Sequence, residues 1–145
     1  QEEKRVLGRT AYLLSGAKSL EKIKPIRTRF AVNGQEYADD ILLGLVCSST
    51  SVGGFQTKKV LDVSLDDGLS EVILVKNIAS LADLSGIATL ITKREFDSRY
   101  FYTFQTKHIE FSFDEPVKWT LDGEFGGSVT DVTIENRKKA VKIIV

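Results

Sequence analysis

The chain has 145 residues, of which 42% are hydrophobic and 28% charged, and its 20 basic and 20 acidic side chains give no net charge. This length is typical of one domain with its own hydrophobic core, and the balanced charge argues against a strongly basic face for nucleic acid. The single cysteine, Cys47, excludes an internal disulfide and favours the reducing cytoplasm. The sequence contains no run of about 20 apolar residues that could span a bilayer and no signal peptide.

The first segment, residues 2–23, is predicted to form an amphipathic helix. Its apolar residues recur at intervals of three and four, at Leu7, Ala11, Leu14, Ala17 and Leu20. Pro25 ends the helix, because the residue before a proline avoids the helical conformation. Because the chain starts at Gln1, without Met, and runs straight into this charged helix, we expect it to be cut from a longer protein.

Strands are predicted to dominate from residue 26 onward. Residues 26–32 alternate between apolar and other side chains, which is the period of a half-buried strand. Asn33-Gly34 is a strong hairpin signal, since both residues tolerate positive φ. The continuously apolar stretch at residues 41–47 predicts a central strand that is covered on both faces, and residues 48–54 form a polar loop that ends in glycines.

The second half of the chain adds one helix and several strands. Residues 60–75 form two short apolar runs around an Asp66-Asp67-Gly68 turn, and Asn77 is the expected N-cap of a second helix. Apolar residues repeat along that helix at Ile78, Leu81, Leu84, Ile87 and Ile91. Alternating patterns at residues 108–114 and 117–121 and in the tail predict further strands. With about seven or eight strands, two helices and no βαβ alternation, the expected class is α+β and mainly β, an antiparallel β-sandwich with two accessory helices.

Few residues are suited to metal or nucleophilic chemistry. One histidine and one cysteine exclude a zinc cage built from those residues, and no phosphate-binding glycine motif is present. His108 falls on the polar side of a strand and is interpreted as a solvated side chain. Cys47 ends an apolar strand and is interpreted as a small core residue.

Two acidic turns remain as candidates for a site. In SLDDGL, residues 64–69, the Asp67 carboxylate and neighbouring carbonyls offer oxygen ligands that suit a hard cation, but Asp-Asp-Gly is also what an ordinary turn uses. In WTLDGEFGG, residues 119–127, Asp122 and Glu124 lie two apart, so in an extended segment they share a face and can converge as a carboxylate pair. An ordinary hairpin explains the same composition, and the residue pattern leaves both alternatives open.

The order of these segments resembles the second domain of the soluble bacterial diacylglycerol kinases, a lipid-kinase family related to the sphingosine and ceramide kinases. The matching stretches cover nearly the whole chain and are, in family order, GRTAYLLSGAKSL, FAVNGQEY, LLGLVCSSTSVGGF, VSLDDGLSEVILV, SLADLSGIATLI and WTLDGEFGG. The pair of DDGL followed by LDGE is more specific than either motif alone. The loop CSSTSVGG departs from the family pattern, in which an Asn often precedes a compact glycine run.

The resemblance implies one part of a two-domain, ATP-dependent kinase that phosphorylates the hydroxyl of diacylglycerol, or of a similar lipid, to give phosphatidic acid. ATP is bound mainly by an N-terminal domain with a GGDGT-type loop. This chain lacks that loop, so residues 1–145 are expected to be the C-terminal β-sandwich domain alone and to be inactive by themselves. The family's catalytic glutamate maps onto Glu124 in the DGE motif. Its structural Mg²⁺, held by one carboxylate and two backbone carbonyls, maps onto Asp67 and the carbonyls of Ser64 and Leu69.

The resemblance also implies partners and a location. The expected partners are the lipid substrate at a membrane surface, the chain's own N-terminal kinase domain and a second copy in a homodimer, with no nucleic acid. The expected location is the cytoplasm, peripheral to the membrane when the enzyme acts on lipid.

Two alternatives stand beside the kinase interpretation. One is a non-catalytic β-sandwich binding module, for example for carbohydrate, and the other is a structural or oligomerisation domain in which both acidic turns are only turns. The binding module predicts a row of exposed aromatic residues, whereas Phe111, Phe113 and Trp119 alternate as core residues do.

Overall fold

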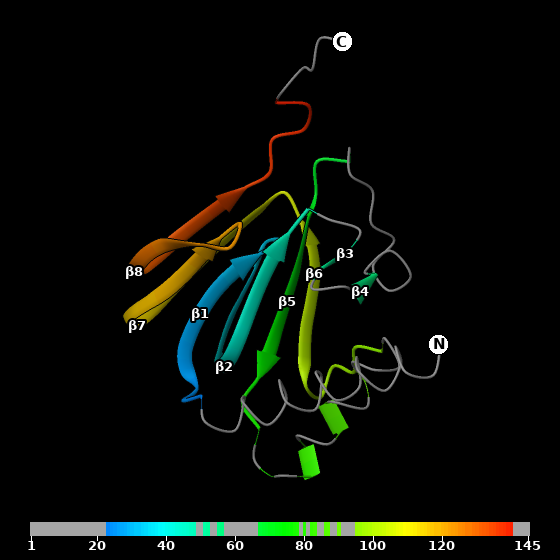
Figure 1. Cartoon of the computed structure of the whole chain (residues 1–145), viewed down its shortest axis with the longest axis vertical. Coiled ribbons are helices and arrows are strands. Elements are labelled where there is room, and N and C mark those ends of the chain that lie inside the picture. The colour runs from blue at the N-terminus through cyan, green and yellow to red at the C-terminus, as the bar shows by residue number, and fades with distance from the viewer. Residues whose placement is uncertain are drawn as a thin grey trace, which may run out of the picture.

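The computed structural model describes residues 23–48, 51–52, 55–56, 67–78, 80, 82–83, 86–87, 90 and 95–140. Within these residues eight antiparallel strands occur, six of them in one sheet of order β6-β5-β2-β1-β7-β8 and two, β3 and β4, in a small separate sheet (Figure 1). The strands are β1 (Ile26–Val32), β2 (Gln35–Cys47), β3 (Ser51–Val52), β4 (Phe55–Gln56), β5 (Ser70–Lys76), β6 (Phe101–Thr106), β7 (His108–Leu121) and β8 (Glu124–Glu135). The predicted antiparallel, mainly β fold is confirmed.

Two of the connections are two-residue hairpin loops. Asn33 and Gly34 join β1 to β2 with φ of 51° and 77°, and Asp122 and Gly123 join β7 to β8 with φ of 48° and 89°. Positive φ at both loop residues defines the type I′ turn, whose twist matches that of the flanking strands. The hairpin predicted at Asn33-Gly34 is therefore confirmed.

The six-stranded sheet curls until its end strand β6 lies against β1 across the main core. In a flat sheet, with strands about 4.8 Å apart, β1 and β6 would lie about 14 Å apart. Instead the ring of Phe30 on β1 lies 5.3 Å from Tyr102 and 6.0 Å from Phe104, both on β6. The Asn33 side-chain amide also donates a 3.1 Å hydrogen bond to the Gln105 carbonyl. The curled sheet therefore encloses its core in the manner of a sandwich.

The enclosed core takes apolar residues from every strand of this sheet. Its buried members are Phe30, Val32, Ile41, Val72, Leu74, Ile109, Phe111 and Phe113, and Trp119 packs against them. Phe111, Phe113 and Trp119 thus belong to the core, as their alternation predicted. They form no exposed aromatic row for a carbohydrate ligand.

The strand that is covered on both faces is β5 and not β2. Residues Ser70–Val75 of β5 are all buried, because Ile73 and Val75 pack with Ile87 and Phe101 in a second cluster on the opposite face. In β2 a bulge between Ile41 and Leu43 interrupts the pairing with β5, and Leu43 is 51% exposed. The prediction of a doubly covered strand at residues 41–47 was therefore wrong.

Helical backbone is described only at residues 82–83, 86–87 and 90, of which Ile87 is fully buried. The cap of this segment is Ser80, whose hydroxyl accepts a hydrogen bond from the Asp83 amide and donates one to the Asp83 carboxylate. Residues 77, 78 and 80 are not helical, so the assignment of Asn77 as the N-cap was wrong; its backbone amide donates to the Asp40 carbonyl. The first predicted helix and residues Leu81, Leu84 and Ile91 lie outside the described residues, and the two accessory helices stay a prediction.

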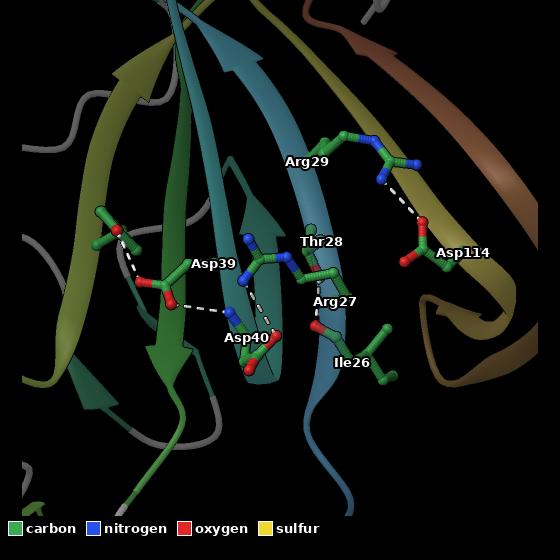
Figure 2. Close-up of polar contacts among 8 residues, drawn as sticks. Ile26, Arg27, Thr28, Arg29, Asp39, Asp40 and Asp114 are labelled. Atoms are coloured by element: carbon green, nitrogen blue, oxygen red, sulfur yellow. Dashed lines mark hydrogen bonds and ion pairs between the residues drawn. The ribbon is translucent and has the colours of Figure 1, made fainter.

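Charged side chains occupy the outer face of β1. Arg27 reaches Asp40 on β2 at 3.4 Å, and Arg29 reaches Asp114 on β7 at 2.8 Å (Figure 2). These pairs are about half exposed, so each contributes little to stability. On the inner face of β2, Asp39 accepts a 2.8 Å hydrogen bond from the Tyr102 hydroxyl of β6, a further contact across the curl. No helix among the described residues is long and apolar enough to cross a membrane.

Candidate functional site

The two acidic turns belong to different parts of the chain, one before β8 and one before β5. Glu124 is the first residue of β8, whereas Asn136, just after the end of β8, contacts Leu69 in the other turn. The 12 residues of β8 lead along the chain from Glu124 to Asn136, and no contact among the described residues joins Glu124 to Asp67. Figure 1 shows the segment before β5 beside the segment after β8. The structure therefore does not bring Glu124 and Asp67 together into one site.

The DGE motif forms the tip of the β7–β8 hairpin. Asp122 and Gly123 are the two turn residues, and Glu124 pairs with Leu121 at the first position of the ladder. Asp122 therefore belongs to the turn and not to an extended strand, so the argument that residues two apart share a face does not apply to this pair. Both carboxylates are exposed, and neither makes a side-chain hydrogen bond or ion pair within the described part of the chain.

Large apolar side chains are exposed beside Glu124. Leu121, its cross-strand partner, is 60% exposed, and Phe125, the next residue, is 71% exposed. A register shift in β8 places Gly126 beneath Leu121, where an added Cβ would lie 2.6 Å from the Leu121 Cγ. Gly127 follows with φ of 118°. The glycines of this stretch thus have local roles in the turn and the bulge, and they leave a carboxylate among exposed apolar side chains.

A buried donor lies close to this tip. The indole nitrogen of Trp119, opposite Gly127, is buried and has no hydrogen-bond acceptor within the described structure. Buried polar atoms nearly always have a partner, so this nitrogen is a feature that the sequence pattern, which placed Trp119 in the core, did not reveal.

The DDG turn is held by hydrogen bonds from two segments. The Asp67 Oδ1 accepts a 2.8 Å hydrogen bond from the Leu69 amide, which closes the turn. The Asn136 side-chain amide donates to the Leu69 carbonyl at 3.1 Å and to the Ser48 hydroxyl at 2.7 Å. Gly68 has φ of 78° and lies against Lys138. The chain after β8 therefore clamps the turn, and Asn136 orients the Leu69 carbonyl.

The oxygen atoms at this turn suit a hard cation. The predicted ligands Asp67 and Leu69 lie within one short bend, and Ser64 lies outside the described residues. Glu71, which sequence reasoning did not select, is buried two residues after Leu69, and neither of its carboxylate oxygens has a hydrogen-bond partner there. A buried, unpaired carboxylate is costly without a compensating charge, so these residues fit a divalent cation. No group of three or more His, Cys, Asp or Glu side chains in the described ranges is arranged to hold one.

The remaining candidates have ordinary surroundings. His108 is half exposed and lies 2.8 Å from the Glu110 carboxylate, which agrees with a solvated histidine. Cys47 is partly buried at the end of β2. The polar loop predicted at residues 48–54 contains the short strand β3 and is followed by β4.

Comparison with known proteins identifies the domain type. The family described as the YegS C-terminal NAD kinase beta sandwich-like domain matches residues 1–145. The diacylglycerol kinase of Bacillus subtilis (strain 168) is 33% identical over 126 residues, which cover 86% of this chain and 41% of that protein. A YegS-like lipid kinase of Shewanella frigidimarina (strain NCIMB 400) is 28% identical over 123 residues, which cover 85% of this chain and 39% of that protein.

Solved structures agree with the fold. A protein from Bacillus anthracis str. Sterne, described as a diacylglycerol kinase, superposes with a TM-score of 0.68 at 24% identity, over 94% of this chain and 45% of that one. The chain thus spans less than half the length of these relatives. Because the family match extends over every residue, the chain belongs to the YegS C-terminal NAD kinase beta sandwich-like domain family.

Proposed function

We propose that this chain is the C-terminal domain of an ATP-dependent lipid kinase that phosphorylates the hydroxyl of diacylglycerol, or of a similar lipid, to give phosphatidic acid. The family match and the names of the relatives support a lipid kinase. The relatives are more than twice as long as the aligned part, which supports an additional domain as the site that binds ATP. That N-terminal domain is then the principal partner of this chain, and the fragment alone is inactive.

The main observation that supports the proposal is the environment of Glu124. An unpaired, exposed carboxylate lies between Leu121 and Phe125, which are 60% and 71% exposed. A lipid alcohol has a reactive hydroxyl attached to an apolar body, and this arrangement offers a base for the first and apolar contacts for the second. The exposed side chains of Leu121 and Phe125 also favour contact with a membrane surface.

Glu124 is proposed to act as the general base. A Glu124 carboxylate oxygen accepts the proton of the lipid hydroxyl as the hydroxyl oxygen attacks the γ-phosphorus of ATP, and ADP leaves with the bridging oxygen. The rigid type I′ turn keeps Glu124 at the start of β8, so the carboxylate needs little reorganisation to meet its substrate.

We propose two roles for Mg²⁺, one with ATP and one structural. With ATP it neutralises phosphate charge in the complete enzyme. In this chain, Asp67 and the carbonyls of Leu69 and Ser64 would hold a second, structural ion. The Asn136 side chain, which bonds the Leu69 carbonyl to the segment after β8, supports a structural role for this ion.

The test is Glu124→Gln in the full-length kinase. Glutamine keeps the size and polarity of glutamate but cannot accept the proton, so kcat should fall by about 10²–10⁴-fold. The melting temperature should stay unchanged, because the side chain is exposed and makes no contact that the substitution removes.

The matched control is Asp122→Asn. It removes a carboxylate two residues away, and asparagine is favoured at this turn position, where φ is 48°. The control should keep both rate and stability. A near-normal kcat for Glu124→Gln would exclude Glu124 as the base, and a loss of kcat in Asp122→Asn alone would assign that role to the other carboxylate.

A further inference from the structure

Glu71 is a charged side chain in a fully buried strand. It lies at the second position of β5, between Cys47 on β2 and Gln105 on β6, and its relative exposure is 0%. Both strand edges of β5 are paired, so the backbone around Glu71 is fixed. Neither carboxylate oxygen has a hydrogen-bond partner of normal geometry, and no ion pair among the described residues includes Glu71.

None of the charged groups that the structure describes next to Glu71 is positive. The described groups near it include the Gln105 side chain and the Asp67 carboxylate, which is itself negative. A carboxylate that is buried beside a second carboxylate is stable only when a cation or a proton offsets the charge.

Oxygen ligands for a cation are available close to Glu71. Asp67 uses only its Oδ1 to close the turn, and the Leu69 carbonyl has a second lone pair beyond the one that accepts from Asn136. Carboxylate and carbonyl oxygens are the ligands that Mg²⁺ and Ca²⁺ prefer. We propose that Glu71 is a ligand of a hard divalent cation at this turn, together with the Asp67 carboxylate and the Leu69 carbonyl.

The proposal adds a buried ligand on β5 to the magnesium site expected at Asp67, Leu69 and Ser64. A cation bound there would join the turn to the most buried strand of the sheet and offset two carboxylates at once. The proposal does not require the chain to be a kinase, so its failure and that of the lipid-kinase assignment are distinguishable.

The experiment measures the melting temperature of the 145-residue chain in metal-free buffer and during titration with MgCl₂ and, separately, CaCl₂ to millimolar concentrations. The wild-type melting temperature should rise by several degrees with at least one of the two ions, because a ligand that binds only the folded state stabilises it. Glu71→Gln should weaken the binding, measured from the titration midpoint, by at least about tenfold, because even loss of an outer-shell partner costs about that much and Glu71 is proposed as a direct ligand. In metal-free buffer Glu71→Gln should not lower the melting temperature, because a neutral amide is easier to bury than a carboxylate.

The matched control is Glu36→Gln, which removes an exposed carboxylate of β2 and should respond to the ions like the wild type. Isothermal titration calorimetry of the wild-type chain gives a readout that does not depend on any variant folding. The proposal is overturned if neither ion raises the wild-type melting temperature or binds in the calorimeter. It is also overturned if Glu71→Gln keeps the wild-type response, in which case the turn binds the ion without Glu71.

Discussion

Replacement of Gly68 by alanine should destabilise the fold by about 2–5 kcal/mol, because two separate effects add at this position. Gly68 has φ of 78°, in the left-handed region, which costs a residue with a Cβ about 1–2 kcal/mol. The new Cβ would also lie 2.8 Å from the Lys138 Cβ. A Cβ cannot rotate away as the end of a side chain can, so residues 136–139 must shift, at a further cost of about 1–3 kcal/mol.

The two effects can be separated by the substitution Gly34→Ala. Gly34 has nearly the same φ, 77°, but an added Cβ there has nothing within 4 Å. Its substitution should therefore show only the conformational cost of about 1–2 kcal/mol. Equilibrium unfolding in guanidinium chloride measures both variants on one scale.

A double variant, Gly68→Ala with Lys138→Gly, should recover part of the loss, because it removes the atom that the new Cβ meets. Equal costs for Gly68→Ala and Gly34→Ala, within about 0.5 kcal/mol, would refute the argument. In that case the segment after β8 does not confine the turn.

Two further predictions concern the enclosed core. Burial, and then the hydrogen bond to Asp39, raise the pKa of Tyr102 to about 12 from 10.0, so its contribution to stability is complete below about pH 10 and is lost as the pH rises toward 12. The difference in unfolding free energy between wild type and Tyr102→Phe should shrink by about 2 kcal/mol over that range in urea titrations, and a constant difference would contradict it. Phe30 is 3% exposed and touches four aromatic rings, so Phe30→Ala should cost about 3–5 kcal/mol in the unfolding assay at neutral pH. A cost below about 1 kcal/mol would show that the curl leaves room around this ring.

Local chemistry explains the features that were predictable from the sequence. The type I′ turn at Asn33-Gly34 depends on two adjacent residues that tolerate positive φ, and no distant contact can change that preference. The alternation of Phe111 and Phe113 likewise reflects a strand with one buried face. Signals of this kind need only neighbouring residues.

Features set by tertiary packing were mispredicted. Residues 41–47 and 70–75 are both mainly apolar runs, and only the packing of Ile87 and Phe101 shows that β5 is the strand covered on both faces. Asn77 is as good an N-cap as Ser80 by residue type, but the chain stays non-helical at residues 77, 78 and 80, and Ser80 caps the helical segment.

The candidate site was predicted in part. The residue pattern singled out both acidic turns, the resemblance gave Glu124, Asp67 and Leu69 their roles, and those roles stay predictions. Glu71 was missed, although a signal was present: it is the one acidic residue within the apolar run at 70–75. An acidic residue stands out only in a strand that is known to be buried on both faces. The prediction assigned that burial to residues 41–47 and not to the strand that contains Glu71.

The pairing of β1 with β7 has a consequence for synthesis of the protein. β1 can form its hairpin with β2 at once, but its other edge waits for a strand about 85 residues further along, the separation of Arg29 and Asp114. At about 5–20 residues per second, that edge stays unpaired on the ribosome for on the order of 5–15 s. An unpaired edge invites pairing with another chain, and charged side chains discourage it. Arg27 and Arg29 would then protect the nascent chain before they form the ion pairs of the folded state.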